Sequence, residues 1–256
     1  MKNPLVILIC LLAIASSCKK SSVDQPNTPL KGKILIVDEY NHVTSDYTGV
    51  TVSVENSETA KIKVDGKGEF QFPELINNSS ELKISISKPR FGTITNYYSN
   101  AQLDNLRKQN SLVTDFALLP QSSVVVNSFS GVVDGENFKM AFNVSLTKDR
   151  PTNGVTLLLT KNNPQISFDN WAGKITDSRS WTVPVTAGDN HTTFCFKHTV
   201  TCPCDFLSSG DTVYIRAYGD TYSQFDNRYI DNSTGKLVFP NINGNSSSST
   251  ISFVVP

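Results

Sequence analysis

The fold of this chain is decided by one stretch in its second half, Phe138–Leu146, which reads FKMAFNVSL. Hydrophobic side chains occupy every second position of this stretch, and lysine, alanine, asparagine and serine stand between them. Because successive side chains of a β-strand point to opposite faces, the alternation predicts a strand with one buried face.

The same two-residue period recurs on both sides of this stretch. Further predicted strands are Lys33–Val37, Thr51–Val54, Leu82–Ile86, Phe116–Leu118, Val155–Leu159, Trp181–Val185, Phe194–Phe196 and Thr250–Val255. The turn sequence Asp65–Gly68 stands between two alternating pairs and predicts a hairpin. A single short helix is expected, over Asn100–Gln109, where Leu103 and Leu106 are three residues apart. Many short strands and one short helix predict an all-β protein.

The order of these segments predicts two antiparallel β-sandwiches in series. Residues 1–17 are expected to be a cleaved signal peptide, and residues 18–30, which are polar and contain two prolines, a flexible tether. The first sandwich is predicted over residues 31–120 and the second over residues 121–256.

The first sandwich resembles the carboxypeptidase regulatory-like domain, which is a transthyretin-like β-sandwich. The matching segments are Gly49–Val54, Asp65–Phe72, Leu82–Ile86 with Arg90–Gly92, and Phe116–Pro120. Domains of this family are accessory modules without catalytic residues, so the resemblance implies none in this part of the chain.

The second sandwich is expected to be immunoglobulin-like. Gly210–Gly219, GDTVYIRAYG, resembles the late strand of fibronectin type III domains in bacterial surface proteins. Strands separated by turns every 8–15 residues suit the same architecture. Thr221–Asn245 is an insertion relative to a minimal module of this kind.

The N-terminus predicts a lipid anchor at Cys18. The apolar run Leu5–Ala15 is too short to cross a bilayer, which takes about 20 residues, but suits the core of a signal peptide. Ala15–Cys18, ASSC, resembles the lipobox of bacterial lipoproteins, in which the cysteine receives acyl chains such as palmitate. The resemblance, with Lys19 after the cysteine, implies an outer-membrane lipoprotein of the Bacteroidota type; the alternative is an ordinary signal peptide with an incidental cysteine.

The charge balance argues against a nucleic-acid partner. The whole chain carries 23 Lys and Arg against 23 Asp and Glu, and neither predicted sandwich has a basic excess. Phosphate backbones are bound by clustered lysine and arginine, and the sequence has no such cluster.

Three cysteines remain after the signal segment: Cys195, Cys202 and Cys204. The favoured hypothesis is one disulfide from Cys195 to Cys202 or Cys204, because the cell envelope is oxidising. Free thiols are the second alternative. A metal site with His198 is the third, although residues 195 and 198 would face opposite sides of a strand.

The aromatic residues of the insertion are the candidate binding residues. Tyr222, Phe225 and Tyr229 stand among polar residues and could stack on sugar rings. Trp181 alternates with two valines and is assigned to the core. Nearby acidic and amide side chains could bind calcium, but ordinary turns of this composition are common and are the favoured interpretation; those side chains are Asp226, Asn227, Asp231 and Asn232.

No motif in the sequence predicts catalysis or a cofactor, and neither metal alternative is the favoured interpretation. The chain has three histidines and no Gly-x-Ser-x-Gly elbow. The resulting hypothesis is a non-catalytic, lipid-anchored binding or presentation protein, whose ligand is a glycan or a partner envelope protein. The alternatives are a structural spacer or adhesion subunit, and a divergent hydrolase that uses paired aspartates.

Overall fold

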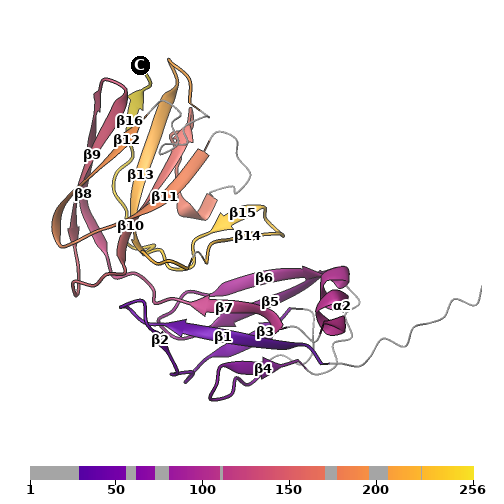
Figure 1. The fold of residues 1–256 in the computed structure, drawn as a ribbon. Helices are drawn as coiled ribbons and strands as arrows, with labels where there is room; N and C mark the ends of the chain where they lie inside the picture. Colours follow the sequence, from indigo (N-terminus) through magenta and orange to yellow (C-terminus); the bar gives the residue numbers. More distant parts are fainter. Residues whose placement is uncertain are drawn as a thin grey trace, which may run out of the picture.

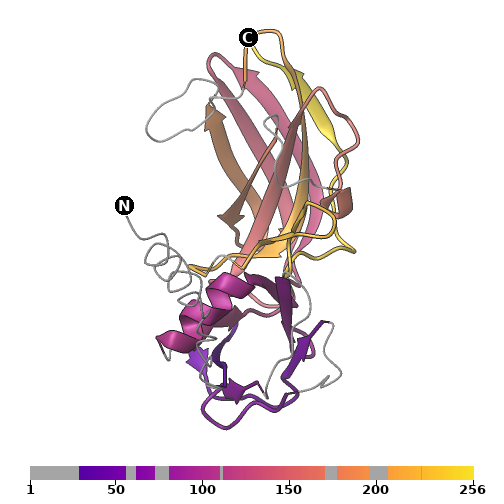
Figure 2. The same cartoon turned by 90° about the vertical axis from the view of Figure 1, so that its right-hand side faces the viewer.

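The computed structural model describes residues 29–55, 62–72, 81–109, 112–170, 178–195, 207–225 and 227–256. The predicted all-β class is confirmed, since β-strands dominate these ranges. Hydrophobic side chains form one large cluster between Leu30 and Leu118 and another between Val124 and Val255. Figures 1 and 2 show the corresponding two bodies stacked end to end. Within the described ranges, no helix has both the length and the apolar character that crossing a membrane requires.

Two sheets enclose the core of the first body. In one sheet β1 (Lys31–Val37) pairs antiparallel with β2 (Val43–Thr44) and β4 (Glu69–Gln71), and parallel with β7 (Leu112–Leu118). The other sheet has the order β3 (Thr51–Val54), β5 (Glu81–Ser87) and β6 (Ile94–Ser99), all antiparallel. Inward side chains alternate along β5 as predicted, with Leu82, Ile84 and Ile86 all buried. The parallel pair joins the first and last strands of this body, which simple alternation does not reveal.

The predicted hairpin around Asp65–Gly68 is only partly correct. The turn forms, because Asp65 N–H donates to the Glu69 carbonyl at 2.9 Å and Gly68 has a φ of 80°. Its two arms then go to different sheets: Ile62 bridges to Val52 of β3, whereas β4 pairs with β1. The turn therefore links the two layers of the first body.

The predicted helix is present as α2 (Asn100–Lys108), one residue shorter than expected. Ser99 caps it: the Gln102 N–H donates to the Ser99 hydroxyl, and the Ser99 N–H donates to Gln102 Oε1 at 2.8 Å. This reciprocal capping box satisfies two N–H groups that a helix start leaves unpaired. Leu103 is the buried residue of the helix and covers one end of the core.

The second body also has two facing sheets. One has the order β11 (Ser178–Pro184), β10 (Asn153–Lys161), β13 (Thr212–Thr221) and β16 (Ile251–Val254). The other has the order β12 (Gly188–Cys195), β9 (Asn137–Ser145) and β8 (Val125–Asp134). The strand predicted from the alternation of FKMAFNVSL is β9, and its Phe138, Met140, Phe142 and Val144 are all buried between the sheets.

Strand β10 is buried on both faces. Val155, Leu157 and Leu159 face the sandwich core, while Leu158 on the opposite face is 0% exposed. A second, smaller cluster covers that outer face, with members Leu158, Ile166, Tyr218, Phe239 and Ile242. The last two belong to the predicted insertion, so this segment folds back over the sheet.

The same insertion contacts the first body. It forms a hairpin of β14 (Tyr229–Asp231) and β15 (Lys236–Val238), which lies beside β6 in Figure 1. The Tyr97 hydroxyl on β6 donates to Asp231 Oδ1 at 2.9 Å, and Asn232 Nδ2 donates to Glu81 Oε1 at 2.7 Å. The hairpin thus bridges the two bodies through residues that are far apart in sequence.

Two further groups of contacts hold the junction. Asn241 Nδ2 donates to the carbonyls of Leu119 and Pro120 at 2.7 and 3.0 Å. On the other side, Arg150 pairs with the Glu39 carboxylate at 2.5 Å, and the Thr152 hydroxyl donates to the Glu39 carbonyl at 2.6 Å. These hydrogen bonds and the ion pair restrain the two bodies relative to each other at three of the places where they meet.

The Asp231 contact makes stability depend on pH. The Ser233 hydroxyl and N–H, the Tyr97 hydroxyl and the nearby Lys83 lower the pKa of Asp231 from 3.8 to about 2. A depressed carboxyl pKa stabilises the folded state above the unfolded pKa, and that stability is lost as pH falls through the folded pKa. Allowing for solvent screening, we expect Asp231 to contribute about 1 kcal/mol at pH 6, most of which is lost by pH 2.

Urea unfolding of the wild type and of Asp231→Asn at pH 6 and pH 2.5 measures this contribution. The Asp46 carboxyl, whose pKa Lys88 also lowers to about 2, titrates in the same range in both proteins. The difference between the two proteins therefore isolates Asp231. Equal acid-induced losses in both would contradict the assignment.

Candidate functional site

A pocket of about 220 Å³ lies on the outer face of the second body, between β11 and the folded-back insertion. We call it the β11 pocket. It combines aromatic side chains with hydrogen-bonding ones, among them Tyr222, Phe225, Phe239, Asp220, Asn227 and Arg228. This position follows from strand alternation, because Ser180 and Thr182 of β11 share the outer face with Thr156 and Leu158 of β10.

Tyr222 and Phe225, two of the three predicted binding residues, line this pocket. Tyr222 is 39% exposed, and its N–H donates to the Thr152 carbonyl at 2.7 Å, which fixes its backbone against β10. Phe225 is half-buried, and its N–H donates to the Ser223 hydroxyl at 3.2 Å. Both aromatic residues are therefore held by backbone hydrogen bonds beside a cavity.

Tyr229, the third predicted residue, lies elsewhere. It belongs to β14, opposite Val238, on the hairpin that packs against β6. Its hydroxyl is close enough to Lys83 and Tyr97 of the first body to act on their pKa values. The structure thus divides the predicted cluster between the pocket and the junction.

The other aromatic residues of this part of the sequence are mostly internal. The Trp181 ring stacks on Phe194 of the facing sheet, with centroids 5.1 Å apart, and packs against the sandwich core as predicted. Tyr218 is 2% exposed and lies beneath the insertion against Phe168. Trp171 falls outside the described residues.

The polar floor of the pocket is a chain of short hydrogen bonds that ends on Asp220. The Thr182 and Thr156 hydroxyls are 2.5 Å apart, and the Thr156 hydroxyl donates to Asp220 Oδ2 at 2.5 Å. Because Thr156 has one hydroxyl proton, Thr182 must be the donor of the first bond. The Thr221 N–H donates to the other carboxylate oxygen at 2.7 Å. Asp220 is only 6% exposed, so these donors offset the cost of burying its charge.

Amide and guanidinium groups form the rim. Asn227 Nδ2 donates to Asn241 Oδ1, and Arg228 donates to the Ser180 hydroxyl at 3.3 Å. Ser223 donates to Asn41 Oδ1 of the first body at 2.9 Å, so the β1–β2 turn reaches the edge of the pocket. The rim is positioned by both bodies.

Asp220 and Arg228 are pocket residues that the sequence pattern did not predict. Asp220 directly follows the predicted strand Gly210–Gly219, but carboxylates are rarely buried, so the sequence offered no reason to place it in a pocket floor. Arg228 offered no signal, because its position over Ser180 depends on how the insertion folds back.

The candidate calcium ligands that the structure describes make other contacts. Asp231 accepts hydrogen bonds from Tyr97 and Ser233, and Asn232 donates to Glu81. Asp226 lies outside the described residues. Across the described ranges, no group of three or more His, Cys, Asp or Glu side chains is arranged to hold a metal ion.

The cysteine hypothesis concerns side chains outside the described part of the chain. Cys195 ends strand β12, but its side chain is not described, and Cys202, Cys204 and His198 lie outside the described ranges, as do Cys18 and the predicted signal segment. The disulfide therefore stays a prediction.

Asp220 is the single carboxylate among the described residues that line the β11 pocket. Glycoside hydrolysis of the common kind uses two carboxyl groups on either side of the bond to be cleaved. Asp220 is buried and accepts hydrogen bonds at both oxygens, which suits a structural role in the pocket floor.

Comparisons with known proteins give structural similarity only. No family model and no curated protein matches the sequence. Among solved structures, the chain is similar to a DUF3823 family protein from Bacteroides ovatus, with 11% identity, a TM-score of 0.32, and coverage of 90% of this chain and 100% of that one. It is also similar to a Bacteroides uniformis protein described as carbohydrate binding, with 12% identity, a TM-score of 0.30, and coverage of 88% and 98%. A DUF3823 family protein from Parabacteroides merdae gives 9% identity, a TM-score of 0.28, and coverage of 88% and 98%. Similarities this weak carry no inference about a ligand.

Proposed function

We propose that this chain is a non-catalytic, lipid-anchored protein of the cell envelope that binds a glycan in the β11 pocket. The observation that carries the proposal is the exposed ring of Tyr222 beside half-buried Phe225, above a floor of hydroxyl and carboxylate groups. Tyr222 is exposed, so its ring is accessible to a ligand at the pocket.

The chemistry of this pocket suits a sugar ring. A pyranose has an apolar C–H face and a rim of hydroxyl groups, and an aromatic ring covers the former while polar side chains bind the latter. The hydrogen bonds among Thr182, Thr156 and Asp220 fix the floor before binding, so little side-chain freedom is lost.

A glycan array probed with residues 19–256 tests the proposal. We expect binding to at least one carbohydrate, and we expect Tyr222→Ala to weaken it by about 2 kcal/mol, or about 30-fold, because an exposed aromatic anchor is lost. Val254→Ala is the control, since Val254 on β16 is 57% exposed and lies outside the β11 pocket. Binding that survives Tyr222→Ala unchanged would place the site elsewhere.

A structural spacer is the second candidate, and the junction favours it. Asp231 accepts a hydrogen bond from Tyr97, the Glu39 carbonyl accepts one from Thr152, and Asn241 donates to Leu119, so the bodies are restrained at three places. Such restraint suits a rigid element that holds a partner at a fixed distance. An array without any bound carbohydrate would favour this alternative over glycan recognition.

The anchor itself rests on the short sequence before residue 19. We expect the wild type to sediment with the membrane fraction and to incorporate labelled palmitate when it is expressed in a bacterium that processes lipoproteins. Cys18→Ser removes the thiol that would be acylated, so that variant should lose the label and leave the membrane fraction. Labelling that persists in Cys18→Ser would contradict the assignment.

A further inference from the structure

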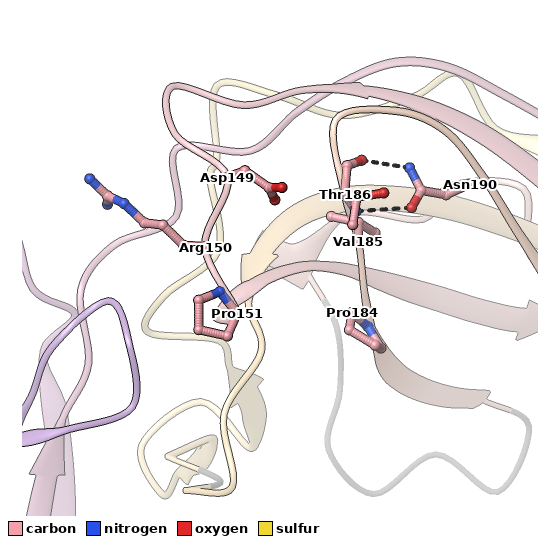
Figure 3. Close-up of a pocket in the computed structure, with 7 residues that line it drawn as sticks. All are labelled: Asp149, Arg150, Pro151, Pro184, Val185, Thr186 and Asn190. Atoms are coloured by element: carbon pink, nitrogen blue, oxygen red, sulfur yellow. Dashed lines mark hydrogen bonds between the residues drawn. The ribbon is translucent and has the colours of Figure 1, made fainter.

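A second cavity, of about 490 Å³, lies at the end of the second body and shares strand β11 with the candidate site. We call it the end pocket; Figure 3 shows its lining residues, which come from Asp149–Pro151, Pro184–Thr186 and Asn190. Ser180–Thr182 of β11 line the first pocket, and Pro184 begins the lining of the second. From Trp181, the middle of the first stretch, to Pro184 at the end of β11 is three residues, or about 10 Å at about 3.3 Å per residue.

Tyr222 of the β11 pocket is hydrogen-bonded to a residue next to the end pocket. Its N–H donates to the Thr152 carbonyl, one residue after Pro151 of the end pocket. The absence of a side chain at Gly154 allows this approach, because a Cβ there would lie 2.9 Å from Tyr222 Cβ and 3.0 Å from Thr182 Cγ2. Gly154 pairs with Pro184 of the end pocket, so Tyr222 packs on β10 next to the β11 residue at which the end pocket begins.

The end pocket has a hydrogen-bonded wall and a lining of mixed polarity. Asn190 fixes its turn: Asn190 Nδ2 donates to the Thr186 carbonyl at 2.8 Å, and the Thr186 N–H donates to Asn190 Oδ1 at 3.0 Å. The rings of Pro151 and Pro184 are exposed, and the Asp149 carboxylate is directed toward the turn in Figure 3. Arg150 is directed away from the cavity and pairs with Glu39 of the first body.

We propose that the β11 pocket and the end pocket are two parts of one groove along β11, and that the groove holds an extended carbohydrate chain. This inference rests on the proposed function and specifies its ligand as an oligosaccharide of several sugars. Proline rings and the Tyr222 ring offer successive apolar surfaces, while Asp149 and the pocket rims offer hydrogen bonds to hydroxyl groups.

A carbohydrate fits this groove better than a peptide. Within the described ranges β11 pairs only with β10, so a peptide could in principle add a strand at its other edge. Pro184 has no N–H and interrupts such a ladder in the middle of the groove. A sugar chain needs no continuous backbone ladder.

Chain length and a filling substitution test the proposal together. The probes are oligosaccharides of one to six sugars, prepared from the polysaccharide that gives the strongest signal on the array, and their affinities are measured by calorimetry. In the wild type we expect affinity to rise at least 10-fold from the single sugar to the longest chain. Thr186→Trp places a large ring on the exposed wall of the end pocket and should remove this gain, while leaving the affinity for the single sugar unchanged.

Thr193→Trp is the matched control, because Thr193 is an exposed threonine on β12 outside both pockets. It should retain the full length dependence. Affinity that is independent of length, or a length dependence that Thr186→Trp leaves intact, would overturn the single groove while the proposed function stands. An array with no bound carbohydrate would overturn both, and so would selective binding of extended peptides in place of sugars.

Discussion

Replacing Gly219 with alanine is expected to lower the free energy of unfolding by about 3 kcal/mol and the melting temperature by about 10 °C. Gly219 lies on β13 opposite Val155, on the inner face of its sheet. A Cβ at this position would lie 2.0 Å from the carbonyl oxygen of Val124, far inside van der Waals contact. The obstacle is backbone, so no side-chain rotation relieves it.

This glycine is where the link between the two bodies enters the second core. Val124 is 0% exposed, and its carbonyl accepts a hydrogen bond from Asn243 Nδ2 at 3.0 Å, while the Asn243 N–H donates to the Gly219 carbonyl at 2.7 Å. Alanine would push the link and the insertion away from β13 together. Their hydrogen bonds would be strained along with the packing.

Differential scanning calorimetry of the variant against Gly66→Ala measures this effect. A methyl group added at Gly66 would meet no heavy atom within 4 Å, and the φ of Gly66 is not positive, so alanine there should change stability by less than about 0.5 kcal/mol. If both substitutions are equally mild, Val124 does not approach β13 as closely as the structure shows.

The elements of the fold could be predicted from the sequence because each strand carries its own period. The inward residues of β5 and β9 alternate strictly, and both strands lie where that alternation predicts. The pairing of β1 with β7 could not be predicted, because about 80 residues separate them and alternation says nothing about which strands become neighbours.

Only part of the candidate site could be predicted from the sequence, again because the sequence pattern is local and the contacts between distant segments are not. Tyr222 and Phe225 could be identified as aromatic residues in a polar segment, which is a local signal. The placement of Tyr229 at the junction and of Arg228 over Ser180 depends on where the insertion folds. That path is set by burial on the outer face of β10, which the alternation along Val155–Leu159 gives no reason to expect.

Replacing Leu158 is the substitution with the largest expected effect that tests whether the insertion packs on the outer face of β10. Alternation assigns Leu158 to the solvent face of β10, but it is 0% exposed beneath Phe239 and Ile242 of the insertion. Leu158→Ala should therefore lower the free energy of unfolding by about 3 kcal/mol, as expected for a buried leucine that leaves a cavity. An exposed leucine on a strand would cost far less.

The same substitution should also weaken carbohydrate binding, because Phe239 lines the β11 pocket and packs in the cluster around Leu158. Leu157→Ala is the matched control: its side chain is equally buried but faces the sandwich core. Both variants should lose similar stability in urea unfolding, whereas the affinity of the folded protein for the array-selected sugar should fall only in Leu158→Ala.

A Leu158→Ala variant as stable as Val132→Ala, which alters a side chain that is 61% exposed, would mean that the insertion does not pack on this face. Because the insertion forms one wall of the β11 pocket and also carries the junction hairpin, the packing around Leu158 is what connects stability, domain arrangement and binding in this chain.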